Sequence, residues 1–319
     1  LYNSEAAILR SKGDAKTPMI ALAVASAVNI ALNLAFVLLF DWGVAGVAWA
    51  TVIATGAAAA ILLVKLCRED EPLRVHPGRV QVIPGEMREM VRIGLPACIQ
   101  GMVFSVSNLV IQTAIKSLGA DAIAASAAAF TIEINCYCVI NAFGQAITTF
   151  VSQNHGARNF ERCMKVTKVG MLLMLAGNLA VSVLAVVFAR PLLAVFNTDP
   201  AVIELGLIRV LYIVIPGPVN CGIEGLSAVL RGFGHSMPPA LAALICICGV
   251  RIAYVWTAFA AWQSFKSLML VYPVSWVATL ALLSGIFIVY MRRVKAQASA
   301  QACVFQAART EASRARPCG

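Results

Sequence analysis

Two carboxylates and one guanidinium stand out among the charged side chains inside long apolar stretches of this chain, where an isolated charge is costly. These side chains are Glu133, Glu224 and Arg251. An ionisable side chain in such a place usually faces a cavity or an opposite charge, and it often marks the route of an ion or a substrate. At a rise of about 1.5 Å per helical residue, Glu133 and Arg251 lie about 16 Å and 15 Å from the same face of the expected helical bundle, and Glu224 lies about 9 Å from the other face. Matching depth predicts an ion pair between Glu133 and Arg251.

Further polar side chains recur every three or four residues along the stretch that carries Glu133. They are Glu133, Tyr137, Asn141, Gln145, Thr148 and Ser152. This spacing confines them to one face of a helix, about a third of its circumference wide. We expect this face to line a cleft, together with polar side chains of neighbouring stretches, namely Gln100, Ser105, Asn108, Gln112 and Asn220.

A second polar group lies near the start of the chain. Asn29 and Asn33 are four residues apart, so they share one face of a helix. Thr51 lies in the next apolar stretch and could supply a third oxygen. The amides either bond to a neighbouring helix or have a functional role together with Thr51.

Eight long apolar stretches carry these residues. They run at about 20–39, 44–64, 93–115, 122–151, 169–189, 202–230, 239–261 and 268–291. Each is long enough to cross a bilayer, which requires about 20 apolar residues. Hydrophobic residues make up 60% of the chain and charged residues 13%, and the mean hydropathy is +0.83. Too little amphipathic sequence remains for the surface of a soluble helical protein, so we predict an all-α polytopic membrane protein.

Basic residues between the stretches indicate the orientation. Of the 25 Lys and Arg residues, 20 fall before Pro18, on alternate connections or after the last stretch. The positive-inside rule then places both termini of this chain in the cytoplasm of a cell-membrane protein. The same distribution explains the net charge of +10 without a nucleic-acid partner. We expect small molecules and the lipid bilayer as partners.

One loop motif occurs twice. Arg10, Gly13 and Pro18 return as Arg231, Gly234 and Pro239, at a constant offset of 221 residues. In each copy the glycine suits a left-handed helix cap and the proline suits the first turn of the next helix. An even number of crossings separates the copies, which predicts two parallel half-molecules of the kind that alternating-access transporters use.

The repeat also predicts the domain organisation. Residues 1–67 would end an amino-terminal lobe, 68–86 a cytoplasmic linker, 87–295 a six-helix carboxy-terminal lobe and 296–319 a cytoplasmic tail. The full protein would have twelve helices in two lobes and act as a monomer. About 130 residues, enough for four helices at about 1.5 Å per residue, would precede Leu1. On this hypothesis the present chain is inactive alone.

Five segments in order resemble the multidrug and toxic compound extrusion (MATE) transporters. They are residues 9–18, 29–33, 43–51, 150–159 and 230–234. The resemblance implies a V of two six-helix lobes that exports organic, often cationic, compounds in exchange for protons or sodium. It also implies that Asn29, Asn33 and Thr51 belong to a cation or proton site, whose ionisable aspartate lies on a first helix that this chain lacks.

Two departures from the family bear on the coupling ion. Asn33 is an amide where some relatives carry a carboxylate, and no acid lies between Arg92 and Lys116, where many relatives have one. The second departure favours protons over sodium.

No cofactor or enzyme activity is expected. The ten cysteines are dispersed, and the pairs Cys136/Cys138 and Cys246/Cys248 point about 200° apart on their helices, which does not suit a shared metal ion. The three histidines are expected in loops, and phosphate-binding and nucleophile motifs do not occur in the sequence. Two alternatives to an antiporter remain, a flippase for lipid-linked saccharides and a vestigial fragment.

Overall fold

The computed structural model describes residues 1–71, 74–76, 78 and 81–314, with side chains up to Arg292. The predicted linker residues Pro72 and Pro77 and the last five residues of the predicted tail lie outside this range. The chain divides into two compact units, Leu1–Met87 and Arg88–Gly319, and each is described by itself.

The described residues of the first unit form three complete α-helices. They are α1 (Tyr2–Lys12), α2 (Lys16–Leu34), which continues into a π-helix, η1 (Ala35–Leu39), and α3 (Gly43–Cys67). Both α1 and α2 pack on α3, whose buried face carries Ala50, Ala54 and Ala58 at four-residue intervals. Small residues at this spacing allow two helices to approach closely in a membrane.

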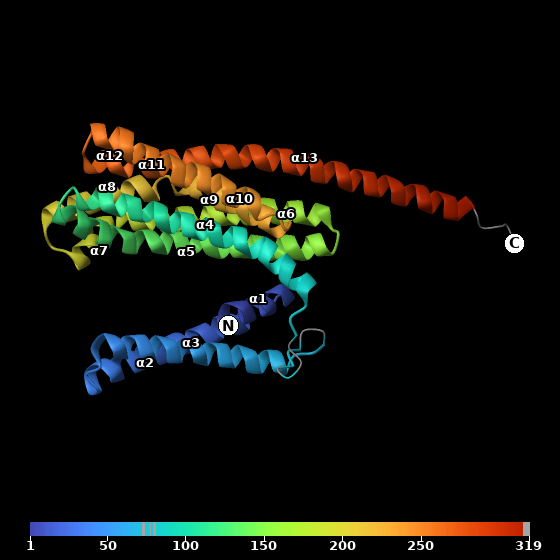
Figure 1. The fold of residues 1–319 in the computed structure, drawn as a ribbon, viewed down its shortest axis with the longest axis horizontal. Helices are drawn as coiled ribbons and strands as arrows, with labels where there is room; N and C mark the ends of the chain where they lie inside the picture. The colour runs from blue at the N-terminus through green and yellow to red at the C-terminus, as the bar shows by residue number, and fades with distance from the viewer. Residues whose placement is uncertain (72–73, 77, 79–80, 315–319) are drawn as a thin grey trace. The chain divides into compact units, whose positions relative to one another are not determined.

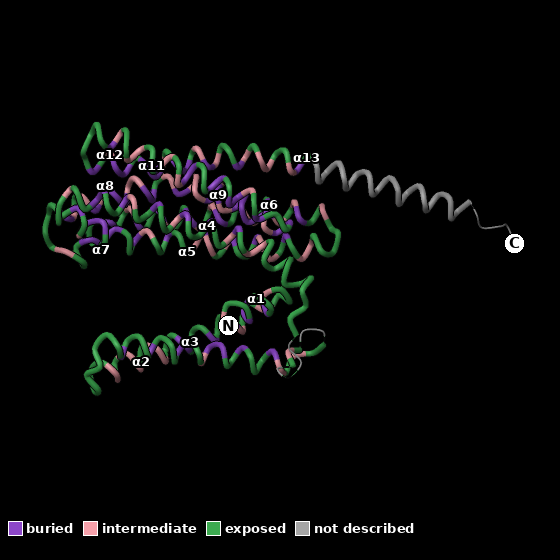
Figure 2. The backbone as a smooth tube through the Cα atoms, in the orientation of Figure 1, coloured by how far each residue is buried: buried purple, intermediate pink, exposed green. Residues whose placement is uncertain are grey.

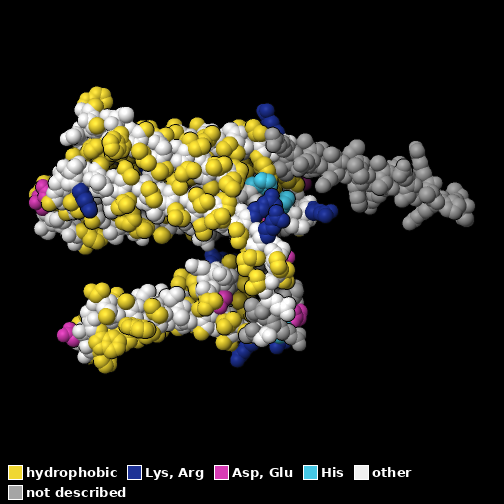
Figure 3. Space-filling model, viewed as in Figure 1, with side chains coloured by type: hydrophobic (Ala, Val, Ile, Leu, Met, Phe, Trp, Pro, Cys, Tyr) yellow, Lys and Arg dark blue, Asp and Glu magenta, His cyan; other side chains and the backbone are white. Residues whose placement is uncertain are grey.

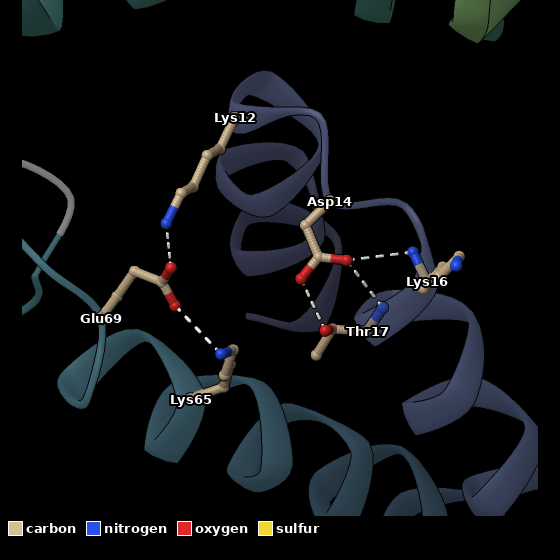
Figure 4. A network of polar contacts seen from close by, with 6 residues as sticks. All are labelled: Lys12, Asp14, Lys16, Thr17, Lys65 and Glu69. Carbon is tan, nitrogen blue, oxygen red and sulfur yellow. Dashed lines mark hydrogen bonds and ion pairs between the residues drawn. The ribbon is translucent and has the colours of Figure 1, made fainter.

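Two sets of polar contacts stabilise the region around the turn between α1 and α2, and one of them also involves the end of α3 (Figure 4). The Asp14 carboxylate accepts hydrogen bonds from the Thr17 hydroxyl at 2.6 Å and from the backbone amides of Thr17 and Lys16 at 3.0 and 3.1 Å, which caps the start of α2. Glu69 pairs with Lys12 and, at 3.3 Å, with Lys65, and so ties the end of α1 to the end of α3.

The same turn recurs in the second copy of the motif. Gly13 has φ +97° and Gly234 has φ +81°, and each donates its backbone N–H to the carbonyl of the arginine three residues earlier at 2.9 Å. Pro18 and Pro239 both lie in the first turn of the following helix. The predicted turn is therefore confirmed in both copies.

The second unit is a bundle whose longest helices are α4, α5, α6, α8, α9 and α13 (Figure 1). The elements are α4 (Pro84–Lys116), α5 (Ala120–Gly156), α6 (Phe160–Val187), α7 (Ala189–Phe196), α8 (Pro200–Val214), α9 (Gly217–Gly232), α10 (Met237–Ala242), η3 (Ala243–Gly249), α11 (Val250–Tyr254), η4 (Val255–Phe259), α12 (Phe265–Met269) and α13 (Val271–Arg314). Helix α5 packs against α6, α8 and α9, while α9 and α11 pack against α13.

Seven helices, or eight when one bent pair counts as a single span, are long and apolar enough to cross a membrane in the described part of the chain. The bent pair is α8 and α9, which meet at 43°. The predicted span over 202–230 corresponds to this bent pair, in which Pro216 and Pro218 interrupt the backbone hydrogen bonds at the bend. The predicted tail continues α13 as far as Arg314.

The surface of the second unit fits this membrane assignment. Its outward-facing residues are exposed, while the buried ones follow the inner faces of the helices (Figure 2). Hydrophobic side chains cover most of the visible face, and Lys, Arg and His side chains gather at one end of the unit (Figure 3). Such a surface suits hydrocarbon around the middle and headgroups at the basic end.

Candidate functional site

A cavity of about 790 Å³ lies within the second unit. Its wall combines side chains from α4, α5, α6, α8, α9, α11 and α13. Aromatic residues line it alongside a few charged and amide groups, which is the composition of a small-molecule pocket. The aromatic residues are Phe104, Phe130, Tyr137, Tyr272 and Trp276.

Glu133 pairs with Arg209 at this cavity. Arg209, on α8, donates from Nε to Glu133 Oε1 at 2.7 Å and from Nη2 to Oε2 at 3.0 Å. Only 7% of the Arg209 side chain and 10% of the Glu133 side chain are exposed. The predicted pair of Glu133 with Arg251 is therefore wrong, because the helix that carries Glu133 packs against α8.

Arg251 has neutral partners instead. Its guanidinium donates to Ser275 Oγ at 3.2 Å, Ser107 Oγ at 3.3 Å and Asn108 Oδ1 at 3.1 Å. Its Cζ lies 4.6 Å from the centre of the Tyr272 ring. These hydrogen bonds and the aromatic face stabilise a charge that is only 2% exposed.

Glu224 lies away from the cavity wall. It forms an ion pair with Arg231, the arginine of the second glycine turn, and it packs beside Gly144 of α5. Asn220, one turn earlier on the same helix, does line the cavity.

The polar side chains predicted to lie along one face of α5 have two different kinds of surroundings. Glu133 and Tyr137 line the cavity. Further along, Gln145 donates to Asn141 at 2.7 Å, and the Thr148 hydroxyl contacts the Ala228 carbonyl of α9 at 3.1 Å. The Ser152 hydroxyl donates to the Thr149 carbonyl of its own helix.

The α4 residues also divide. Ser105, Asn108 and Gln112 line the cavity, whereas Gln100 is buried outside it.

His155, which was expected in a loop from the sequence, lies in the last turn of α5.

Sequence reasoning missed several residues of the cavity wall. Arg209 is a charge inside the apolar stretch 202–230, which is a signal that could have identified it, whereas Tyr272 and Trp276 belong to no repeating polar pattern in the sequence. Ser126, Asn178 and Ser182 line the cavity too, and their buried polar atoms have no hydrogen-bonding partner among the described residues. Because buried polar groups are normally hydrogen-bonded, these three are available to a ligand.

The structure brings Asn29, Asn33 and Thr51 together in the first unit. Asn33 donates to Asn29 Oδ1 at 3.0 Å, and Asn29 donates to Thr51 Oγ1 at 3.4 Å. The buried Asn33 Oδ1 has no hydrogen-bonding partner among the described residues. The three side chains thus form a short polar chain between α2 and α3.

The described part of the chain has up to eight apolar spans, and the second unit encloses a largely apolar cavity with a few charged groups, which together define a polytopic membrane protein of the transporter class. The sequence model of the MatE family matches residues 96–257, which is half of the chain. The chain therefore belongs to the MatE family.

Relatives of known name support this membership. The chain is 28% identical over 250 residues to the probable multidrug resistance protein NorM of Thermotoga maritima, covering 77% of this chain and 54% of that protein. It is 27% identical over 297 residues to the probable multidrug resistance protein YoeA of Bacillus subtilis, covering 90% of this chain and 64% of that protein. The chain thus spans between half and two thirds of the length of these relatives.

A solved structure shares the fold. The crystal structure of a mutant of the Vibrio cholerae MATE transporter VcmN aligns with a TM-score of 0.82 at 18% identity, covering 92% of this chain and 66% of that one. The all-α transporter architecture expected from the sequence is confirmed.

Proposed function

We propose that this chain contributes to a secondary active antiporter that exports organic compounds in exchange for protons or sodium. The observation that carries the proposal is the cavity of about 790 Å³ inside a MatE-family bundle. Two relatives named as probable multidrug resistance proteins support export of varied compounds. The aromatic lining with few polar groups suits ligands that differ in shape.

The polar chain of Asn29, Asn33 and Thr51 is the proposed place for the coupling cation. Its amide and hydroxyl oxygens are ligands that a sodium ion accepts, and the unpartnered Asn33 Oδ1 is available to one. None of the three side chains titrates, so coupling to protons would need a carboxylate elsewhere. Measuring transport with a pH gradient and with a sodium gradient distinguishes protons from sodium as the coupling ion.

Transport by the full-length protein in proteoliposomes tests the proposal, and the present chain alone is expected to be inactive. Vesicles loaded with a fluorescent dye are given a pH gradient, a sodium gradient or neither, and we expect dye movement with one gradient and its loss when an ionophore collapses that gradient. Gln112→Trp, which fills the cavity from α4, is expected to stop transport. The matched control is Val169→Trp, at a position that is 56% exposed on α6. Gradient-independent leakage, or equal activity of both variants, would contradict the proposal.

The proposal also includes the orientation of the chain in the membrane and the oligomeric state of the full-length protein. Both ends of the chain lie in the cytoplasm and the full-length protein works as a monomer. Single cysteines near Arg158 and Gly234, in a cysteine-free background, are expected to react with impermeant thiol reagents from the cytoplasmic side alone. Labelling of either position from outside would reverse the orientation.

A further inference from the structure

The charge of Arg251 is not balanced by any acid among the described residues. Its three hydrogen-bonding partners, Ser107, Asn108 and Ser275, are neutral. No carboxylate in the described part of the chain forms an ion pair with it, although it is 2% exposed and belongs to the cavity wall. A buried charge of this kind normally has a partner of opposite sign.

The cavity as a whole is cationic. Its wall contains three basic side chains, Lys116, Arg209 and Arg251, and one acidic side chain, Glu133. The bidentate pair of Arg209 with Glu133 neutralises both of those charges. The remaining charge on the described wall is positive and is centred on Arg251 and Lys116.

The surroundings of Arg251 favour an aromatic or apolar body next to an anionic group. Tyr272 lies against both guanidiniums, with ring-centre distances of 4.6 Å to Arg251 and 5.8 Å to Arg209. Trp276 follows one helical turn later and also lines the cavity. Arg251 itself lies between two π-helices, η3 and η4, and π-turns inside helices frequently occur at functional sites.

We infer that the cavity recognises organic anions, with a carboxylate, sulfonate or phosphate of the ligand bound by Arg251 and its body held against Tyr272 and Trp276. A guanidinium provides paired N–H donors that match such groups. The inference rests on the proposed function only for the direction in which the ligand moves, because binding itself needs no gradient.

Three probes of similar size and different charge test this inference. They are 2-naphthoate, 2-naphthamide and 2-naphthylmethylammonium, titrated into the purified chain by calorimetry with detergent alone as the blank. We expect the anion to bind about tenfold more tightly than the neutral amide, since a hydrogen bond to a charged group is stronger than one between neutral groups. The cation is expected to bind most weakly. Tighter binding of the cation than of the anion would overturn the inference. This test uses the unmodified chain, so its outcome does not depend on the folding of a variant.

A charge-placing variant then locates the site. Asn108→Asp keeps the size of the side chain and puts a carboxylate where Asn108 Oδ1 now lies, 3.1 Å from Arg251 Nη1. It gives Arg251 an internal partner, so the anion should lose its roughly tenfold advantage over the amide. Asn220→Asp is the matched control, because it adds the same charge to the cavity wall from a different helix.

The Asn220→Asp control distinguishes direct contact with Arg251 from a general effect of negative charge in the cavity. If Asn108→Asp reduces the affinity advantage of the anion over the amide more than Asn220→Asp does, direct binding by Arg251 is supported. Equal reductions in the two variants overturn it.

Competition in nanodiscs addresses the source of the anion. Displacement of naphthoate by phosphatidylglycerol, but not by phosphatidylcholine, would assign Arg251 to a lipid headgroup and overturn the assignment to a soluble ligand. Failure of dye transport with intact naphthoate binding would reject the exporter and leave this site standing.

Discussion

Glu133 on α5 and Arg209 on α8 form a bidentate ion pair, with donor–acceptor distances of 2.7 and 3.0 Å, at the wall of the cavity. The pair joins two helices through residues that are 76 positions apart in sequence. Each side chain is at least 90% buried, so neither charge is well solvated without the other. A buried pair of this kind contributes less to stability than its Coulomb energy suggests, but loss of one partner leaves a costly isolated charge.

This pair leads to the first prediction. Glu133→Gln and Arg209→Gln should each reduce the free energy of unfolding by about 3–5 kcal/mol, because each strands a buried charge. The double variant should lose clearly less than the sum, since it strands none. Unfolding of the purified variants in detergent, followed by circular dichroism, measures all three values.

An exposed ion pair of the same unit supplies the control. Arg190 and Glu204 lie 2.8 Å apart with side chains that are 66% and 57% exposed. Their Gln variants should change the free energy of unfolding by about 1 kcal/mol or less. Additive losses at Glu133 and Arg209 would mean that the two residues do not act as a pair.

The partner of Glu133 could not be predicted from depth alone. Arg209 lies nine residues from the start of α8, or about 14 Å at a rise of about 1.5 Å per residue, so its depth matches Glu133 as well as that of Arg251 does. The choice between them is made by which helices pack together. Residue patterns within a single sequence do not indicate which helices pack against each other.

Other features follow from local rules and were predictable. The apolar stretches, the two glycine turns and the shared face of Asn29 and Asn33 depend on residues within one or two helical turns. The contact of Asn29 with Thr51 also followed, because consecutive helices are usually neighbours. The cavity wall was less predictable, since packing of α13 on α11 is what brings Tyr272 to Arg251 and Trp276 to the same cavity.

The second prediction concerns Asp14, whose pKa is lowered because the Thr17 hydroxyl and backbone amide hydrogen-bond to the carboxylate. The folded state therefore favours the charged form. Asp14 should stabilise the protein above the unfolded-state pKa of about 3.9, and this contribution should disappear as the pH falls through the lower folded-state pKa. The difference in thermal stability between the wild type and Asp14→Ala, measured from pH 7 to pH 2, should shrink in that range.

Thr17→Val tests the cause of this shift. It removes the hydroxyl donor at 2.6 Å but retains the backbone amide donor at 3.0 Å. The pKa of Asp14, followed by carboxyl-carbon NMR, should rise part of the way towards its ordinary value. Thr55→Val is the control, because the Thr55 hydroxyl bonds to the Thr51 carbonyl and not to Asp14. An unchanged pKa in Thr17→Val would assign the shift to the backbone alone.

The third prediction compares the two glycine turns. Gly13 and Gly234 have φ of +97° and +81°, and a Cβ at either position would meet no heavy atom within 4 Å. Gly13→Ala and Gly234→Ala should therefore destabilise only through the left-handed backbone, by about 1–2 kcal/mol each. Gly56→Ala in α3 also has open space but an ordinary helical backbone, and it should stabilise by about 0.5–1 kcal/mol. Unfolding in detergent measures the three variants. A neutral Gly234→Ala beside a destabilising Gly13→Ala would show that the repeated motif does not impose the same turn in both units.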